Sequence, residues 1–140
     1  MVTISLCMIV KNEERVLGRC LESVQEIADE IIIVDTGSED RTKEIAEKYH
    51  ARVFEQEWQD DFSRARNYSF SHAEMDYCMW LDADDIITKS EALKLKRWKE
   101  ETDESSDVIM LRYVAGFDEK RNPTLVYYRE RIVKRESIIT

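Results

Sequence analysis

The sequence predicts an α/β protein with an open, mostly parallel sheet and helices on both faces. Continuous apolar runs such as "TISLCMIV" (3–10) and "DEIIIVD" (29–35) have the character of strands buried on both faces. Between these runs the apolar residues recur at helical spacing. Regular alternation of such strands and helices is typical of a parallel sheet. The 140 residues fit one domain, 1–140.

The elements follow in the order that this sheet requires. Apolar residues at helical spacing predict a helix over 11–27, and the acidic pair Glu13 and Glu14 suits its N-terminus. The other predicted elements are, in order, a strand over 29–35, a turn with a helix cap over 36–40, a helix over 41–50, a short strand that begins 51–58, a helix over 61–73, a strand over 77–85, a helix over 89–102, and strands over 107–117 and 125–133 with a turn at Asn122 and Pro123.

The composition excludes several classes of function. The formal net charge of −9 disfavours a nucleic acid or an anionic membrane as partner. No apolar run approaches membrane-spanning length. Cys7, Cys20 and Cys78 lie within apolar runs, which indicates reduced core thiols and a cytoplasmic protein. His50 and His72 lack the spacing of zinc ligands.

Ligands of open α/β sheets bind beyond the carboxyl ends of the strands. This rule selects Lys11 and Asn12 after the first strand, Asp35 after the second, and the acidic run 82–85 after the fourth, all on one edge. The glycines of a dinucleotide-binding motif are missing from "VKNEER", and the sequence contains no P-loop. An EF-hand is excluded because Ile86 stands where another oxygen ligand is required.

The stretch "YCMWLDADD" (77–85) places three carboxylates after an apolar strand. In a continuing strand, Asp82 and Asp84 would face the same way, with Cα atoms roughly 6.5 Å apart. Mg²⁺ takes one or two protein carboxylates and completes its coordination with waters and substrate phosphates. A metal–diphosphate complex would therefore relieve the repulsion within this cluster. An isolated DxD motif can instead cap the following helix or simply face solvent, without any role in function.

Four segments, "SLCMIVKNEE", "IIIVDTGSEDRT", "ARN" and "LDADD", resemble glycosyltransferase family 2 with its GT-A fold in their order and spacing. The resemblance covers residue 3 to about residue 135. It implies an inverting transferase that uses a nucleotide-sugar donor, a UDP-sugar in the first instance, and a divalent cation, Mn²⁺ or Mg²⁺. It leaves open the sugar, the oligomeric state and whether the acceptor is a saccharide, a lipid-linked group or a protein.

The same resemblance implies a role for each motif. In the family, the loop after the first strand lies against the nucleotide, the acidic residue after the second strand hydrogen-bonds the base or ribose, and the arginine of "ARN" borders the nucleotide. The first aspartate of DxD contacts the ribose or a metal-bound water, and the second is the direct metal ligand. The implied nucleotide-binding residues are Val10, Lys11, Asn12, Asp35, Arg66 and Asp82, and the implied metal ligand is Asp84.

Simpler structural roles compete with these assignments. Lys11 fits a solvated lysine equally well, Asp35 fits a turn residue that bonds its own backbone, and Arg66 fits a surface helix residue. The last predicted strand adds basic residues that can offset the acidic edge, and the sequence does not choose among Arg129, Arg131, Lys134 and Arg135.

The catalytic base stays unidentified. The family takes an Asp or Glu from the acceptor-binding half, and the spacing marks out none of Asp103, Glu104, Asp107, Asp118 and Glu119. We therefore expect a nucleotide-sugar-binding domain that lacks part of the acceptor-binding half and transfers sugar poorly alone. One alternative is a non-catalytic nucleotide-binding module of the same fold. A haloacid-dehalogenase-like phosphatase is disfavoured because its DxD follows the first strand of the core, not the fourth.

Overall fold

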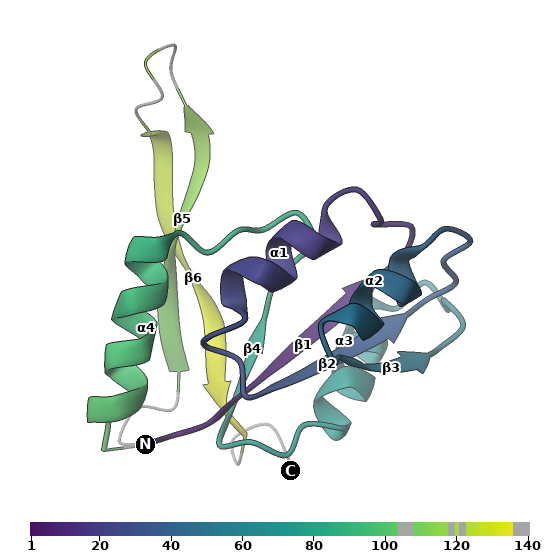
Figure 1. Ribbon diagram of the computed structural model, residues 1–140, viewed down its shortest axis with the longest axis horizontal. Helices are drawn as coiled ribbons and strands as arrows, with labels where there is room; N and C mark the ends of the chain where they lie inside the picture. The colour runs from purple at the N-terminus through teal and green to yellow at the C-terminus, as the bar shows by residue number, and fades with distance from the viewer. Residues whose placement is uncertain (104–107, 118–119, 121–122, 136–140) are drawn as a thin grey trace.

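A six-stranded sheet in the order β3-β2-β1-β4-β6-β5 forms the centre of the computed structural model, which describes residues 1–103, 108–117, 120 and 123–135 (Figure 1). β1 to β4 run parallel, whereas β6 pairs antiparallel with both β4 and β5. The α/β fold with a mostly parallel sheet is thus confirmed. The strands are β1 Ile4–Val10, β2 Glu30–Asp35, β3 Arg52–Glu55, β4 Tyr77–Trp80, β5 Val108–Phe117 and β6 Pro123–Lys134.

Helices cover both faces of the sheet, as expected. Alternate strand residues face opposite ways, so Leu6, Met8 and Ile33 pack into the main core, while Cys7 and Ile32 pack into a smaller cluster on the other face. The main core includes residues of α1, α2 and α4, and the smaller cluster includes α3. Among the described residues no helix combines the length and apolar character needed to cross a bilayer. The helices are α1 Leu17–Val24, α2 Thr42–Lys48, α3 Phe62–Ser71 and α4 Lys89–Glu101.

The first helix begins later than the sequence predicted. Glu13 and Glu14 precede α1 in a loop, and Asn12 in that loop has a φ of 53°. The backbone N–H of Glu13 donates to Thr42 Oγ1 (2.8 Å), and that of Asn12 donates to Ser38 Oγ (2.9 Å). These long-range bonds take the place of helical ones, so the predicted helix start was wrong. They fasten the β1–α1 loop to the β2–α2 loop.

The fourth strand ends earlier than predicted. β4 stops at Trp80, which pairs with Cys7 at the last position of the β1–β4 ladder. The acidic residues form a turn in which the N–H of Asp85 donates to the carbonyl of Asp82 (2.9 Å). Asp82 and Asp84 therefore do not share one face of a strand, and that prediction was wrong. A turn brings their carboxylates together instead.

β5 and β6 form a long hairpin on the far side of β4. β6 joins the sheet through pairs such as Met79 with Ile132 and Tyr77 with Lys134. Figure 1 shows the other end of the hairpin extending beyond the helices. Pro123, predicted in a turn, is the first residue of β6, and Asn122 lies outside the described residues. The hairpin brings one end of β6 beside the strand that precedes the acidic turn.

Candidate functional site

The carboxyl ends of the four parallel strands meet at one edge of the sheet. The ladder between β1 and β2 ends with Val10 opposite Asp35, and the next ladder ends with Asp35 opposite Glu55. β4 lies on the other side of β1 and also runs parallel to it. Asp35 and the acidic turn after β4 therefore lie at the same edge, on either side of β1, as the sequence predicted.

Asp35 ends β2 with an almost fully buried side chain, 1% exposed. Its Oδ1 accepts the backbone N–H groups of Gly37 (2.9 Å) and Ser38 (2.7 Å). Its Oδ2 is buried, and no described residue donates a hydrogen bond to it. A buried acceptor without a partner costs about 1–3 kcal/mol. Asp35 therefore accepts hydrogen bonds from its own turn, which is the simpler role considered from the sequence. Its second oxygen remains open.

The turn after β2 depends on Gly37. Its φ is +120°, a conformation that side-chain-bearing residues rarely adopt. This conformation helps to aim successive backbone N–H groups at the Asp35 carboxylate. A hollow of about 330 Å³ opens beside the turn, and the ion pair of Lys43 and Glu55 forms part of its lining. The hollow thus combines buried and exposed charged groups at the carboxyl end of β2.

Val10, Lys11 and Asn12 are placed at the same edge but have different local roles. The Val10 side chain is buried in the main core, and its carbonyl accepts the N–H of Thr36 (3.0 Å). The Oδ1 atom of Asn12 accepts the N–H of Glu39 (2.8 Å) and so helps to fasten the two loops. Lys11 is exposed at a hollow of about 250 Å³, and no described residue pairs with its ammonium group. Of these three residues, Lys11 is therefore the one whose side chain is available to a ligand.

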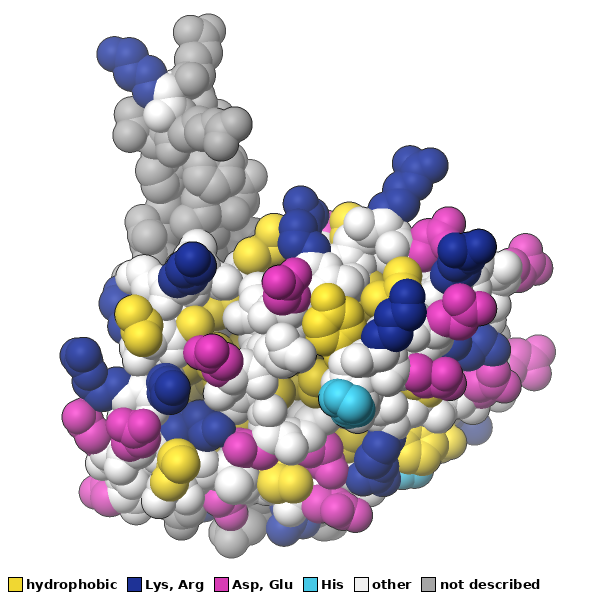
Figure 2. Space-filling view, viewed as in Figure 1, with side chains coloured by type: hydrophobic (Ala, Val, Ile, Leu, Met, Phe, Trp, Pro, Cys, Tyr) yellow, Lys and Arg dark blue, Asp and Glu magenta, His cyan; other side chains and the backbone are white. Residues whose placement is uncertain are grey.

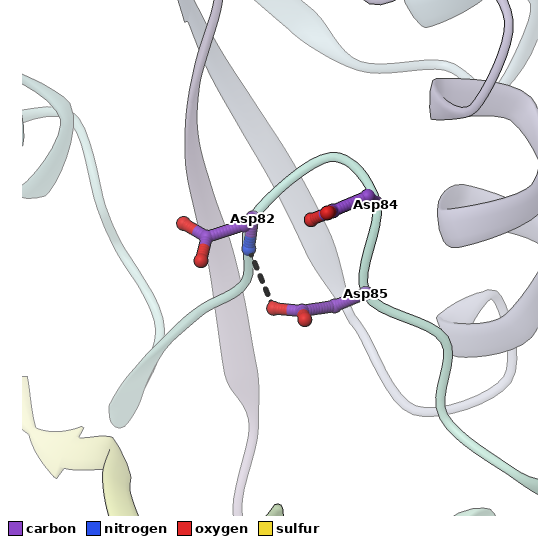
Figure 3. Close-up of side chains that lie close together, drawn as sticks. All are labelled: Asp82, Asp84 and Asp85. Atoms are coloured by element: carbon purple, nitrogen blue, oxygen red, sulfur yellow. Dashed lines mark hydrogen bonds between the residues drawn. The ribbon is translucent and has the colours of Figure 1, made fainter. Parts of the chain in front are cut away.

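Asp82, Asp84 and Asp85 lie on a single turn, and one carboxylate oxygen of each lies within 4.8 Å of the others (Figure 3). The backbone N–H of Asp82 donates to Asp85 Oδ2 (2.8 Å), so Asp85 braces the turn. The Asp84 side chain is exposed, and no described residue forms a hydrogen bond or ion pair with its carboxylate. The three carboxylates are therefore not equivalent, and Asp84 is the open one.

Among the described residues, Arg131 on β6 pairs with this turn. The Arg131 side chain is 6% exposed, and its Nη1 donates to the carbonyl of Trp80 (3.4 Å). Its Nη2 lies 3.8 Å from Asp82 Oδ2 and 3.7 Å from Asp85 Oδ2. The sequence offered four basic residues in this segment without a choice. The antiparallel pairing of β4 and β6 places Arg131 at the end of β4.

Arg66 approaches Asp82 from α3. Its guanidinium carbon lies 4.7 Å from the ring centroid of Phe62 and 5.3 Å from that of Trp80, both at cation–π distance. Burial lowers the pKa of Arg66; the charge of Asp82 opposes this effect, and the charge of Arg131 adds to it. Arg66 is thus half-buried beside the acidic turn, unlike an ordinary surface helix residue.

Negative charge remains concentrated at this edge. Burial raises the pKa of the Asp85 carboxyl, although the Asp82 N–H and Arg131 oppose that effect. Burial also raises the pKa of Glu13, and Asp84 adds to that increase. Both shifts mean that the site holds protons more readily than isolated carboxyls do, and a cation relieves the same repulsion. A set of carboxylate oxygens matches the ligand preference of Mg²⁺ and Mn²⁺.

A larger hollow of about 770 Å³ is lined by residues of α1, of α4 and of the segment between the acidic turn and α4. Its lining mixes apolar Ile87 and Leu93 with charged Glu22 and Lys96. Figure 2 shows this face, on which hydrophobic side chains form small patches between charged ones. The lining includes none of the strand-end carboxylates. The edge of the sheet is therefore the candidate site, although its hollows are smaller.

The described residues identify no catalytic base. Val2, just before β1, donates its N–H to the carbonyl of Lys99 (3.0 Å), so α4 ends at the amino-terminal edge of the sheet. Asp103 follows that end of α4 and lies away from the candidate site. The other acidic residues considered from the sequence lie outside the described residues: Glu104, Asp107, Asp118 and Glu119.

Comparisons with known proteins agree with this architecture. The model of the family described as "Glycosyl transferase family 2" matches residues 5–139. A TPR repeat-containing protein from Synechococcus elongatus is 46% identical over 100 residues, which cover 71% of this chain and 23% of that protein. The prophage-derived glycosyltransferase SunS from Bacillus subtilis is 32% identical over 97 residues, which cover 68% of this chain and 23% of SunS.

A solved structure shows the same fold. Glucosyl-3-phosphoglycerate synthase from Mycobacterium tuberculosis, crystallised with Mn²⁺, UDP and glucosyl-3-phosphoglycerate, is 25% identical with a TM-score of 0.52. The match covers 59% of this chain and 33% of that chain. The present chain thus spans about a quarter of the two curated relatives and a third of this enzyme. From the sheet, the motifs at its edge and the family match over nearly all residues, we conclude that the chain belongs to glycosyltransferase family 2 and has the GT-A fold.

Proposed function

We propose that the chain is the donor-binding part of an inverting glycosyltransferase that uses a nucleotide-diphospho-sugar, in the first instance a UDP-sugar, and a divalent cation. One observation carries the proposal: the open buried oxygen of Asp35 and the open carboxylate of Asp84 lie at the same sheet edge, on either side of β1. A nucleoside diphosphate has hydrogen-bond donors at one end and metal-binding oxygens at the other. The nucleoside end can donate a hydrogen bond to Asp35, and the diphosphate end can share a divalent cation with Asp84.

The nucleoside is proposed to bind beside Asp35. A uracil N–H or a ribose hydroxyl is a donor that Asp35 Oδ2 lacks among the described residues. Lys11 lies at the neighbouring hollow with an ammonium group available to a phosphate or a base carbonyl. Val10 and Asn12 are proposed to contribute through the backbone and the loop shape, because their side chains are used in the core and in the loop contacts.

The diphosphate is proposed to bind beside the acidic turn. Asp84 is the proposed metal ligand, and Asp82 is proposed to contact the ribose or a metal-bound water. Arg66 supplies fixed cationic donors that match phosphate oxygens. When bound, the divalent cation supplies Lewis-acid stabilisation of the leaving diphosphate. The chain's own residues orient the donor so that the anomeric carbon faces the acceptor side.

Two of the similar proteins support this proposal. Glucosyl-3-phosphoglycerate synthase was crystallised with Mn²⁺ and UDP, and SunS is named as a glycosyltransferase. We propose that residues 1–140 form one donor-binding domain, with the base and most acceptor contacts supplied outside it. Buried free thiols at Cys7, Cys20 and Cys78 support placement in the reducing cytoplasm.

A second candidate function is nucleotide binding without transfer. It is favoured by the position of Asp103, which lies at the opposite end of the sheet from the candidate site, whereas a base must lie within hydrogen-bond reach of the acceptor hydroxyl. The phosphatase alternative is dropped, because the chain belongs to glycosyltransferase family 2. Within the first candidate function, the acceptor is proposed to be a saccharide, a lipid-linked group or a protein.

Calorimetry tests the proposal directly. The purified chain is titrated with UDP in Mn²⁺, in Mg²⁺ and in a chelator, and the expected result is binding that strongly depends on the metal. Equal UDP affinity in chelator and in Mn²⁺ would overturn the metal-dependent site. A product-detected assay with several UDP-sugars and acceptors then separates the two candidates, and we expect slow donor hydrolysis with very little transfer from this chain alone. Efficient transfer would show that the base is already present.

A further inference from the structure

Arg131, on β6, places a buried positive charge beside the acidic turn that follows β4. A buried guanidinium is stable only when it is paired and hydrogen-bonded. Its contacts with the carbonyl of Trp80 and the carboxylates of Asp82 and Asp85 all lie at the end of β4. The proposed donor contacts described above do not include this residue. Its position therefore needs a separate explanation.

The contacts of Arg131 divide the three carboxylates into two kinds. Asp85 is engaged twice, by the N–H of Asp82 and by the guanidinium, and its side chain is only 15% exposed. Asp82 is more exposed but also lies near Arg131. Asp84 remains without a partner among the described residues. The arrangement thus holds Asp85 in place, gives Asp82 a nearby counter-charge and leaves Asp84 open.

We infer that Arg131 is a positioning residue that acts as the permanent counter-charge of the acidic turn and reserves Asp84 for a divalent cation. The inference rests on the proposed metal–diphosphate site. The formal charge of three carboxylates is cancelled by one guanidinium and one divalent cation together. With both present, the turn no longer repels the diphosphate of an incoming nucleotide. Without Arg131, the three carboxylates of the turn keep one formal negative charge even when the cation is bound, while Arg66 and Glu13 nearby contribute the same charges in both cases.

This charge balance gives Arg131→Gln two opposite effects. Mn²⁺ alone is expected to bind about fivefold more tightly, because a nearby positive charge is gone and three carboxylates become available. UDP in saturating Mn²⁺ is expected to bind about tenfold more weakly, because the loaded turn stays negative and is less well ordered. A residue with a merely structural role would weaken both ligands together. Calorimetry with Mn²⁺ alone and then with UDP measures the two effects separately.

Two further variants separate charge, geometry and general destabilisation. Arg131→Lys retains the charge but not the planar fork, so Mn²⁺ affinity should stay near the wild-type value while UDP affinity falls about threefold. Lys134→Gln removes the same charge from the same strand at the other end of the β4 ladder, opposite Tyr77, and should change neither affinity. Circular dichroism confirms that each variant is folded.

The outcomes separate this inference from the proposed function. Equal behaviour of Arg131→Gln and Lys134→Gln, or parallel weakening of Mn²⁺ and UDP in Arg131→Gln, would overturn the role of Arg131. Absence of metal-dependent UDP binding in the wild-type chain would overturn the proposed function, while the titration with Mn²⁺ alone would still decide the role of Arg131. If Arg131→Gln does not fold, the Lys variant decides: a Mn²⁺ affinity far from wild type would contradict the inference.

Discussion

Asp35 and Asp84 lie at the same edge of the sheet, but their carboxylates are held in different ways. Asp35 is buried, and two backbone N–H groups from its own turn hold one of its oxygens. Asp84 is exposed on a turn whose neighbours are other carboxylates and whose counter-charge, Arg131, comes from β6. One end of the site is built by local backbone geometry, and the other by a balance of charges from distant segments.

This difference predicts how each end responds to change. At the Asp35 end, replacing the carboxylate removes a hydrogen-bond acceptor that the backbone holds in place. The resulting loss of ligand affinity should depend little on metal or salt. A site built from opposed charges responds to pH, ionic strength and cations. If the two ends behave independently, a substitution at one end should leave ligand binding at the other end unchanged.

Asp84→Asn should give the largest loss. Removing the proposed direct ligand should weaken Mn²⁺-dependent UDP binding by about 100-fold, since even indirect support of a metal is worth 10–100-fold. Binding of uridine, which has no phosphate, should not change. Calorimetry with both ligands measures the difference. Glu101→Gln at the end of α4 is the matched control, because that exposed carboxylate lies at the opposite edge. An Asn variant that keeps wild-type metal dependence would contradict the assignment.

Asp35→Asn should weaken uridine and UDP equally, by about 10–30-fold, because Asn keeps a neutral acceptor and so loses only the lower part of the roughly 1.5–3 kcal/mol that a hydrogen bond to a charged acceptor contributes. The ratio of UDP affinities with Mn²⁺ and with chelator should stay as in the wild type. The same calorimetric series with the two ligands measures both quantities. A variant that loses metal dependence but keeps uridine affinity would show that Asp35 acts at the metal end.

Lowering the pH should weaken Mn²⁺ binding at the acidic turn. Burial raises the pKa values of Asp85 and Glu13, so protons compete with the cation at higher pH than they do at ordinary carboxyls. The loss of Mn²⁺ affinity should therefore begin above the pH range in which ordinary Asp and Glu carboxyls, with pKa values of about 4, take up protons. Mn²⁺ titrations across and above this range measure it, and Glu13→Gln should make the dependence shallower. An affinity that falls only in the pH range of ordinary carboxyls would contradict the electrostatic description of this end.

Gly37→Ala should give the smallest effect on binding. The added methyl group meets no atom within 4 Å, so the penalty comes from the φ of +120° alone. Strain of this kind costs about 1–3 kcal/mol of stability, and it should shift the N–H groups that hold Asp35. We expect a lower midpoint of thermal unfolding, a few-fold loss of uridine affinity and no change in Mn²⁺ affinity. A loss of Mn²⁺ affinity in this variant would show that the two ends are coupled.

The sequence predicted those parts of the fold that depend on local pattern. Continuous apolar runs identified the strands, and the rule for strand ends brought Asp35 and Asp84 to one edge. It missed the start of α1, because side chains far along the chain, such as Thr42 and Ser38, bind the backbone N–H groups of the loop. It also extended β4 into the acidic turn, since no local signal marks where pairing with β1 ends.

The choice of Arg131 among four basic residues was beyond the sequence for a different reason. It depends on how β6 is aligned with β4, and the hairpin contains several register irregularities along its length. A shift by one residue would point a different side chain toward the turn. The structural use of Asp85 was likewise missed, because its bond to the N–H of Asp82 exists only once the turn has formed.

The bonds between the β1–α1 and β2–α2 loops have a consequence for protein engineering. Asn12 donates its N–H to Ser38 and accepts the N–H of Glu39, while Glu14 accepts the N–H of Arg41 (3.1 Å). The two segments therefore form a single module, although about two dozen residues of chain separate them. Transplanting either loop alone into a homologous scaffold would leave its bonding partners behind. A graft intended to transfer the proposed nucleoside-binding edge has to carry both loops as one unit.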